Sequence, residues 1–250
     1  MYSRANTVPK SQLTNTKLKY VEHYWHTIPR EERKWNLDYI QILSVDPGLK
    51  NYTILIQRRM TNGITFPLLY NKLDFTSDDE SSHYGYLLHF FESQKELIKG
   101  CHIFLIERQL PQNYKMVRIS QHTISYIMFQ TLNNSLLPSI YEVDTKLKGI
   151  YLGVKKSDDV KKIAIERAIQ LLTSRNDKYS LSVLNNTKKK DDLADVIIQI
   201  EALFYELQYF QIPILPIPEP VIETSESVET KTSVESIHKS TPRLILKNKN

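Results

Sequence analysis

Two carboxylates that could bind a metal ion directly follow runs of residues typical of β-strands. Asp46 follows Tyr39–Val45 and precedes a Pro-Gly pair, which ends a strand. Glu107 follows Cys101–Ile106, an almost unbroken apolar run of the kind found in a strand buried on both faces. If the two strands are neighbours in one sheet, we expect both carboxylates at the same sheet edge.

A second pair of acids, Asp192 and Asp195, lies in the first turn of a helix predicted from about Lys190 to Tyr209. Residues three apart share one helix face, so these two carboxylates should point in the same direction. The apolar stripe of this helix would dock it on the core and leave the acidic pair near the strand ends.

Carboxylates that lie within a few Å of one another repel and raise one another's pKa unless a cation is present. Hard divalent ions with oxygen ligands relieve this repulsion, and Mg²⁺ also accepts water and phosphate oxygens as ligands. Two such ions about 4 Å apart can clamp a scissile phosphate. A cage built from carboxylates alone therefore favours phosphodiester chemistry.

Each acid also has a simpler interpretation. An Asp before Pro-Gly is common in turns, and a Glu after an apolar strand can mark the return to solvent. Asp191, Asp192 and Asp195 could complement the dipole of their helix. The combination is less easily explained in this way, because separate segments place acids where one fold would bring them together.

The elements that must position these acids follow from hydrophobic periodicity and turn residues. The predicted order is three strands, a helix, a strand, a helix, a strand and two helices. The strands are expected at 39–45, 52–58, 64–70, 101–106 and 139–143, and the helices at 84–99, 112–134, 158–173 and 190–209. This order predicts an α/β protein with a mixed five-stranded sheet and helices on both faces, as in the ribonuclease-H-like fold.

Composition divides the chain into three parts. Residues 1–38 form a polar, basic N-terminal leader, and residues 39–211 carry the predicted nuclease domain. Residues 212–250 are rich in Pro, Ser, Thr and Glu and are predicted to be disordered.

Charge and cysteine content limit the classes of function. The net charge of +5 at pH 7 favours an anionic partner such as nucleic acid. A single cysteine, Cys101, excludes a disulfide within the chain and suits a reducing compartment. We expect a soluble intracellular protein with no membrane contact, because no signal segment or apolar run of about 20 residues occurs.

Other common sites find no support. The seven histidines lack zinc-like spacing, and neither a Walker loop nor a Gly-x-Gly-x-x-Gly motif occurs. His102 is expected to be a hydrogen-bonded core histidine. A small-molecule substrate is therefore not expected.

Three segments resemble the acidic motifs of RuvC-type Holliday junction resolvases, in particular the poxvirus-type branch found in large DNA viruses. The segments are Ile42–Tyr52, Leu105–Gln109 and Lys188–Asp195, and the resemblance covers about residues 39–210. The leader and the tail depart from the compact pattern of that family.

The resemblance implies a homodimer that resolves four-way (Holliday) junctions by paired symmetric nicks, in viral DNA recombination or replication. It implies two Mg²⁺ ions per active site, which Mn²⁺ could replace, held by Asp46, Glu107, Asp192 and Asp195. Asp191 is the alternative to Asp192. The expected location is the site of viral DNA replication, in the host cytoplasm or nucleus.

Lysines near the acids could contact DNA phosphates. Lys188, Lys189 and Lys190 directly precede the acidic helix, although a solvated loop would also explain them. A second basic region contains Lys155 and Lys156, with further lysines at 146, 148, 161 and 162. We expect phosphate contacts from both regions.

The sequence is also compatible with other functions. The fold also serves RNA–DNA hybrid nucleases and exonucleases, which act on linear substrates as monomers. A non-catalytic branched-DNA-binding module could keep the fold, although all four acids are present. An actin-like sugar kinase would need a duplicated domain and phosphate loops that the sequence lacks.

Overall fold

The computed structural model describes residues 21–23, 38–76, 80–133, 138–155 and 158–207. The chain divides into two units, Met1–Pro213 and Ile214–Asn250, and every described residue belongs to the first. Most of the predicted leader and all of the predicted tail lie outside the described residues. The proposed division into leader, nuclease domain and tail therefore stays a prediction.

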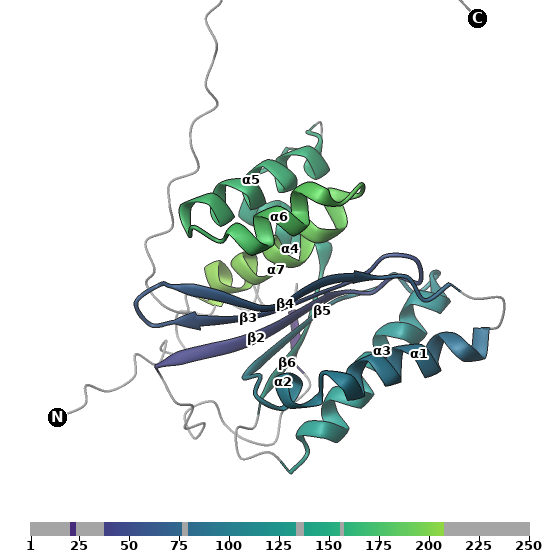
Figure 1. Ribbon diagram of the computed structural model, residues 1–250. Helices are drawn as coiled ribbons and strands as arrows, with labels where there is room; N and C mark the ends of the chain where they lie inside the picture. Colours follow the sequence, from purple (N-terminus) through teal and green to yellow (C-terminus); the bar gives the residue numbers. More distant parts are fainter. Residues whose placement is uncertain (1–20, 24–37, 77–79, 134–137, 156–157, 208–250) are drawn as a thin grey trace, which may run out of the picture. The chain divides into compact units, whose positions relative to one another are not determined.

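All five predicted strands are present and form one mixed sheet (Figure 1). β2 (Tyr39–Asp46) pairs antiparallel with β3 (Tyr52–Met60), which pairs antiparallel with β4 (Thr65–Leu73). On its other side β2 pairs parallel with β5 (Ile103–Glu107), and β5 pairs parallel with β6 (Ser139–Val143). The mixed sheet and the five strands predicted from the sequence are confirmed.

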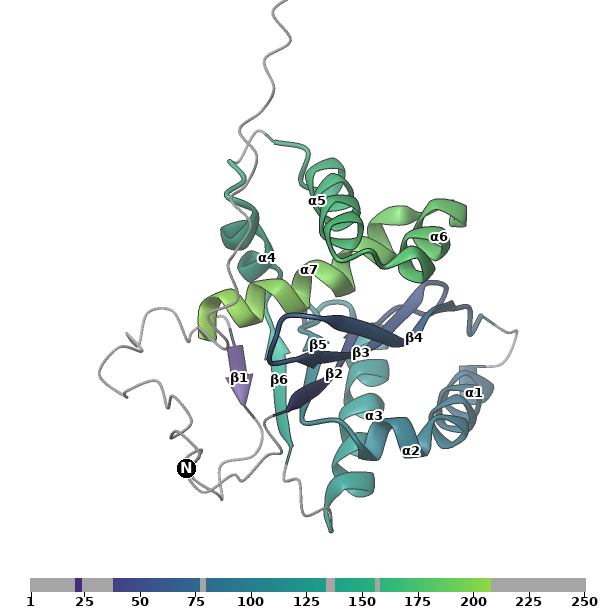
Figure 2. The same cartoon turned by 60° about the vertical axis from the view of Figure 1, so that its left-hand side comes forward.

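A sixth strand was not expected. β1 (Val21–His23) pairs antiparallel with the outer edge of β6, so the sheet order is β1-β6-β5-β2-β3-β4 (Figure 2). This segment falls within the predicted leader. Three residues are too few for an alternating pattern to be read from the sequence, and only pairing with β6 defines the strand.

Helices cover both faces of the sheet, as predicted (Figures 1 and 2). One face carries α1 (Glu80–Ser93), α2 (Lys95–Lys99) and α3 (Tyr114–Thr131). The opposite face carries α4 (Thr145–Leu152), α5 (Val160–Ser174), α6 (Lys178–Asn186) and α7 (Lys190–Leu207).

Three details of the helix prediction were wrong. The single helix expected at 84–99 is two helices, because the backbone leaves the helical conformation at Gln94. The short helices α4 and α6 were missed, although each has an N-terminal cap. Asp144 accepts a hydrogen bond from the Lys146 backbone N–H, and Asp177 accepts one from that of Ser180. Gly153 ends α4 in the left-handed region, at φ 66°.

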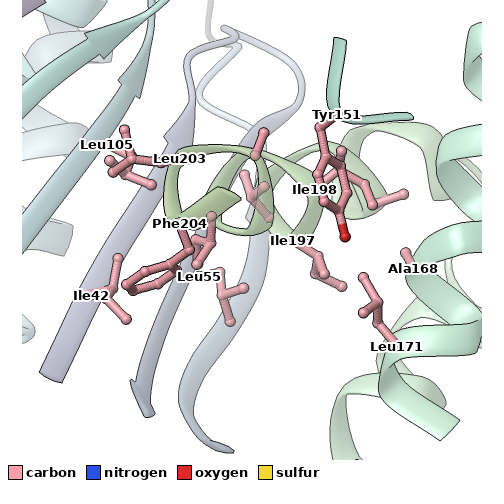
Figure 3. Close-up of a cluster of buried hydrophobic side chains, with 14 of the residues drawn as sticks. Ile42, Leu55, Leu105, Tyr151, Ala168, Leu171, Ile197, Ile198, Leu203 and Phe204 are labelled. Carbon is pink, nitrogen blue, oxygen red and sulfur yellow. The ribbon is translucent and has the colours of Figure 1, made fainter. Parts of the chain in front are cut away.

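Helix α7 lies between the sheet and the outer helices (Figures 2 and 3). Figure 3 shows Leu203 and Phe204 of α7 beside sheet residues such as Leu105, while Ile197 lies toward Leu171 of α5. Burial of α7 on both sides explains why its sequence is apolar over more than one narrow stripe. This packing fixes the N-terminal turn of α7, which carries the acidic pair.

A buried ionic cluster adds to this anchoring. Glu201 of α7 accepts a hydrogen bond from Arg59 of β3 and lies 2.8 Å from the Nη2 of Arg175, at the end of α5. Burial would raise the pKa of the Glu201 carboxyl, but the two arginines lower it to about 2. Arg59 also stacks on the Phe204 ring, 4.5 Å from its centroid. Glu201 is therefore a charged link between α7, the sheet and α5.

The second core lies between the sheet and α1–α3. It is rich in aromatic residues, and Tyr52 donates or accepts a hydrogen bond with Thr123 of α3 at 2.9 Å. His102 is buried, and its Nδ1 accepts a hydrogen bond from the Gln41 backbone N–H at 3.1 Å. The expectation of a hydrogen-bonded core histidine is thus confirmed.

Candidate metal centre

Three of the four predicted acids come together at one end of the sheet. Because β2 and β5 are adjacent and parallel, their C-terminal ends meet, and Val45 pairs with Ile106 in the register. Asp46 and Glu107 are the next residues along their strands. Asp195 reaches the same place from α7, and single carboxylate oxygens of the three residues lie within 4.8 Å of one another. The expected neighbourhood of Asp46 and Glu107 is confirmed.

Local structure holds Asp46 at the end of β2. Gly48 permits a tight turn into β3, because a Cβ at this position would lie 2.9 Å from the backbone oxygen of Asn51. The turn brings Thr53 into register with Asp46. A larger residue at position 48 would push the turn away and displace the carboxylate at its base.

Buried neighbours hold Asp195 in place on α7. Leu193, Ala194 and Val196 are fully buried, and the Tyr70 hydroxyl donates a hydrogen bond of 2.8 Å to the backbone oxygen of Leu193. Asp195 itself stays partly exposed. The helix therefore cannot rotate its acid away from the strand ends without exposing apolar surface.

Electrostatics at the cluster favour a bound cation. Burial and the nearby Glu107 raise the pKa of Asp46 well above its usual value, with smaller contributions from Asp195 and Asp192. The pKa of Glu107 is also raised, first by burial. Each pKa is raised because negative charges that are partly buried and close together are unfavourable. A bound divalent cation would stabilise the charged carboxylates and lower these pKa values.

The surroundings of Lys148 differ from those expected from the sequence. It was grouped with lysines expected to contact phosphate, but only 7% of it is exposed. Its Nζ lies 2.7 Å from Glu107 and 2.9 Å from Asp195. Burial alone would lower the pKa of Lys148, yet these two acids raise it above the usual value. Phosphate contact by Lys148 was therefore a wrong prediction.

The sequence contained a signal for this placement. Asp144 and Gly153 bracket a short capped helix, in which Leu147, Tyr151 and Leu152 are buried together with Lys148. Reading the segment as a helix would have placed Lys148 on its apolar side. A lysine there needs an acidic partner.

The structure does not place Asp191 or Asp192 in the three-acid group. Asp192 forms an ion pair of 2.9 Å with Lys72 of β4, and Asp191 forms one of 2.6 Å with Lys161 of α5. The hydrogen bond from Lys161 lowers the pKa of Asp191. Asp192 nevertheless lies close enough to Asp46 to raise the pKa of that carboxyl. Asp192 as a metal ligand stays a prediction.

The lysines predicted to bind DNA differ in their surroundings. Lys188 and Lys189 are exposed immediately before α7, whereas Lys190 is partly buried and lies 3.4 Å from the Asn185 side-chain oxygen. Lys155 is exposed after α4, and Lys156 lies outside the described residues. Exposed ammonium groups beside the acids remain suitable for phosphate contact.

The donor set fits a hard divalent cation. Asp46, Glu107 and Asp195 offer carboxylate oxygens, with no sulfur or imidazole ligand in the group. Mg²⁺ and Mn²⁺ prefer such ligands and commonly retain waters. When a cation binds, Lys148 would either share these carboxylates with it or lose its ion pairs with Glu107 and Asp195.

Two curated proteins are similar in sequence to part of this chain. The uncharacterized protein 170L of Invertebrate iridescent virus 6 is 30% identical over 137 residues, covering 46% of this chain and 55% of that protein. The uncharacterized protein 97L of Invertebrate iridescent virus 3 is 30% identical over 103 residues, covering 41% and 47%. The chain thus spans about half the length of the curated relatives it matches. No model of a known protein family matches the chain.

Solved structures give a likeness in fold. The crystal structure of the yeast mitochondrial Holliday junction resolvase Ydc2 matches with a TM-score of 0.52 at 17% identity, covering 68% of this chain and 83% of that one. RuvC of T. thermophilus in complex with a Holliday junction substrate gives a TM-score of 0.45 at 12% identity, covering 68% and 97%. The chain has the ribonuclease-H-like fold predicted from the order of its elements.

Across the described residues, every helix is too short or too polar to cross a membrane.

Proposed function

We propose that this protein is a divalent-metal-dependent DNA endonuclease that resolves four-way junctions by paired nicks. The observation that carries the proposal is the convergence of Asp46, Glu107 and Asp195 within 4.8 Å at the strand ends. The fold likeness to a Holliday junction resolvase and the three acidic motifs support the choice of substrate. Branched DNA is therefore the proposed partner.

In this proposal, each acidic residue has a defined task. Asp46, Glu107 and Asp195 hold the cation, and Asp192 joins them after separating from Lys72. Two bound Mg²⁺ ions, or Mn²⁺ in their place, would supply water activation and charge stabilisation at the scissile phosphate. Lys188 and Lys189 bind the DNA backbone and offset its repulsion by the acids.

Lys148 is proposed to balance charge at the centre. Its ammonium neutralises Glu107 and Asp195 while the cation is absent, which keeps the acids from repelling one another. Cation binding then competes with this internal ion pair. The site is thereby kept folded without metal, and metal affinity is reduced by the cost of separating Lys148 from its partners.

We propose that two copies act together, since paired nicks require two active sites. The C-terminal end of α3 and the residue that follows it offer a contact surface, with Phe129 75% and Leu132 59% exposed. Large exposed apolar residues that lie close together are typical of protein contacts. Sedimentation of the chain with and without junction DNA tests this point. A monomer bound one-to-one to a junction would contradict coordinated cleavage.

The similarity to two iridescent virus proteins supports a role in viral DNA recombination or replication, at the site where viral DNA is copied. The poxvirus-type branch of resolvases is the proposed affiliation within that setting. Both points extend beyond the fold and are part of the proposal.

One assay tests the proposal directly. Purified protein with Mg²⁺ is given a synthetic four-way junction, a linear duplex of the same sequence and an RNA–DNA hybrid. We expect symmetric nicks in the junction alone, no cleavage after chelation, and binding without cleavage by Asp46→Asn. Cleavage of the linear substrates instead would favour another ribonuclease-H-like nuclease, and full activity of Asp46→Asn would refute the site.

A second candidate function is a branched-DNA-binding module without catalysis. The observation that favours it is Lys148, because this residue gives two of the clustered acids a partner within the protein. Calorimetric titration with Mg²⁺ and Mn²⁺ separates the candidates. A module without catalysis binds the junction but shows no cation binding that depends on Asp46 or Glu107.

A further inference from the structure

A pocket of about 360 Å³ opens beside the acidic centre. Its walls come from the β2–β3 turn, the end of β4, the C-terminal part of α6 and the first turn of α7. The lining residues that bear on its chemistry are Lys50, Asn51, Asn71, Lys72, Asp74 and Thr187. A volume of this size is typical of sites that hold a small organic group.

The strand register connects this pocket to the metal centre. Asp46 pairs with Thr53, and Thr53 pairs with Lys72. Directly paired residues project from the same face of a sheet, so Asp46, Thr53 and Lys72 form one row across three strands. Two inter-strand spacings separate the ends of this row by about 10 Å. The rise along the axis of B-form DNA is about 3.4 Å per nucleotide, so this distance corresponds to at most about three nucleotides.

Asp192 lies between the pocket and the acidic centre. Its carboxylate lies 2.9 Å from the Lys72 ammonium at the pocket, and it precedes Asp195 of the acidic group by three residues on α7. A DNA strand that runs from the acids along the row of Asp46, Thr53 and Lys72 would pass the mouth of the pocket. The two sites can act on neighbouring parts of one strand.

The polar groups of the pocket suit a phosphate and a base. Lys50 is exposed, and the carboxylate of Asp74 is already engaged by Thr76, whose backbone N–H donates to it at 2.9 Å. Asp74 keeps its negative charge, so the lining holds the ammonium groups of Lys50 and Lys72 against one carboxylate and is positive by one charge. No nucleophilic cysteine or histidine lines it. This composition indicates binding rather than a second reaction.

Two amide side chains remain available for recognition. Asn71 uses its Oδ1 to accept from the Lys72 backbone N–H at 2.8 Å, and the hydrogen bond seen at Asn51 uses that residue's backbone oxygen. Among the described residues, no partner is seen for the Asn51 side chain or the Asn71 Nδ2. The Asn51 amide offers a donor and an acceptor side by side, which matches the edge of adenine, and Asn71 adds a donor from its Nδ2.

The pocket is built on rigid structure. Asn51 is held by the close approach of Gly48, at which a Cβ would come within 2.9 Å of the Asn51 oxygen. Leu193 at the base is fully buried and fixed by the hydrogen bond from Tyr70. A preformed site of this kind loses little conformational entropy when it binds a ligand.

We propose that this pocket is a subsite for one nucleotide of the cleaved DNA strand, within about three nucleotides of the scissile phosphate. Lys50 binds the phosphate of that nucleotide, and the amides of Asn51 and Asn71 read its base, with a preference for adenine. The inference rests on the proposed junction-cleaving function and adds a source of sequence preference to it.

The test uses a panel of four-way junctions that carry each of the four bases at every position within three nucleotides of the cut. Cleavage is measured for the full-length chain and for Asn51→Ala, Asn71→Ala and Lys50→Ala. Binding is measured by fluorescence anisotropy, with Asp46→Asn added to each chain. Lys99→Ala and Asn133→Ala serve as matched controls, because both lie on helices or turns of the opposite sheet face. Thermal unfolding of every variant verifies that it is folded.

We expect wild type to cleave junctions with adenine at one position at least tenfold faster than the others. Asn71→Ala and Asn51→Ala should lose that preference, whereas Lys50→Ala should weaken binding to all sequences and lower the salt dependence of log Kd by about one. The controls should match wild type. All of these residues are exposed or half-exposed, so the variants should fold.

The outcomes separate this inference from the proposed function. Wild-type cleavage whose sequence pattern and binding are unchanged in all three pocket variants overturns the subsite and leaves the nuclease intact. A wild-type chain that neither binds nor cleaves branched DNA overturns both. A preference that persists at the same position in Asn51→Ala and Asn71→Ala would show that other residues read the base.

Discussion

The ammonium of Lys148 lies 2.7 Å from the Glu107 carboxylate, inside the group of acids that is proposed to bind metal. Lys148 comes from α4 and Glu107 from the end of β5, so the ion pair joins a helix to the central sheet. Asp195 of α7 lies 2.9 Å from the same ammonium. One buried cation thus connects three elements around the candidate centre.

Replacing Lys148 should lower the stability of the folded protein, because the clustered acids lose the cation that pairs with them. We expect Lys148→Met to lower the free energy of unfolding by about 3 to 5 kcal/mol without divalent ions, because it leaves the largely buried Glu107 carboxylate without its partner. Mg²⁺ should then stabilise the variant more than wild type, since binding to the folded state no longer competes with the lysine. Denaturant unfolding with and without Mg²⁺ measures both effects. Lys146→Met, an exposed change on the same helix, is the control; equal stability of the two variants would contradict the role of Lys148.

Substitutions in the acidic turn of α7 should differ in effect. Asp195→Asn should abolish cleavage, because Asp195 belongs to the clustered group. Asp192→Asn should also reduce it strongly, by at least a hundredfold if the residue becomes a ligand or supports one. Asp191→Asn should stay within a few fold of wild type, since Asp191 pairs with Lys161 at the surface. Single-turnover cleavage of a junction measures all three, and a greater loss in Asp191→Asn than in Asp192→Asn would reverse the assignment.

The Glu201 cluster should make stability depend on acid pH. The pKa of the folded carboxyl is about 2, against 4.5 for the unaffected group, because Arg59 and Arg175 outweigh its burial. The lowered pKa means that this stabilisation is present above pH 4.5 and is lost as pH falls from 4.5 to 2. The difference corresponds to about 3 kcal/mol.

Glu201→Gln should therefore be less stable than wild type at pH 7 and lose less stability between pH 4.5 and 2. Urea unfolding across this range measures the change. Glu166→Gln is a suitable control, because Glu166 is exposed and its pair with Lys162 is a surface contact of 4.0 Å. Parallel pH curves for wild type and Glu201→Gln would contradict the account of α7 anchoring.

The lysines before α7 should contribute to DNA affinity through charge. Replacing Lys188, Lys189 and Lys190 together by Gln should weaken junction binding at low salt and reduce the slope of log K against log salt by up to about 3. The partly buried Lys190 should account for the smallest share. Anisotropy titrations at several salt concentrations measure the slope. An unchanged slope would place these lysines away from the DNA.

The sequence by itself determined the order of strands and helices and the ends of the strands that carry Asp46 and Glu107. Hydrophobic periodicity and Pro-Gly punctuation are local signals, and they identify the side of an element that is buried. They placed Asp192 and Asp195 together on one face of α7, near the strand ends, and indicated the ribonuclease-H-like fold. Short elements were missed, because β1 is defined by pairing with β6 and α4, with eight residues, is too short to show a clear hydrophobic period.

Only the tertiary structure decided the partners of the charged residues. The sequence could not distinguish Lys148 from the neighbouring lysines, because its partners come from β5 and α7. In the same way, Asp192 and Asp195 look equivalent in the sequence because they share one helix face. They differ in the structure, where Asp192 pairs with Lys72 of β4 and Asp195 joins the acidic group. Ion pairs between distant segments depend on how the helices dock on the sheet, and that arrangement is set by packing of the whole core rather than by any local pattern.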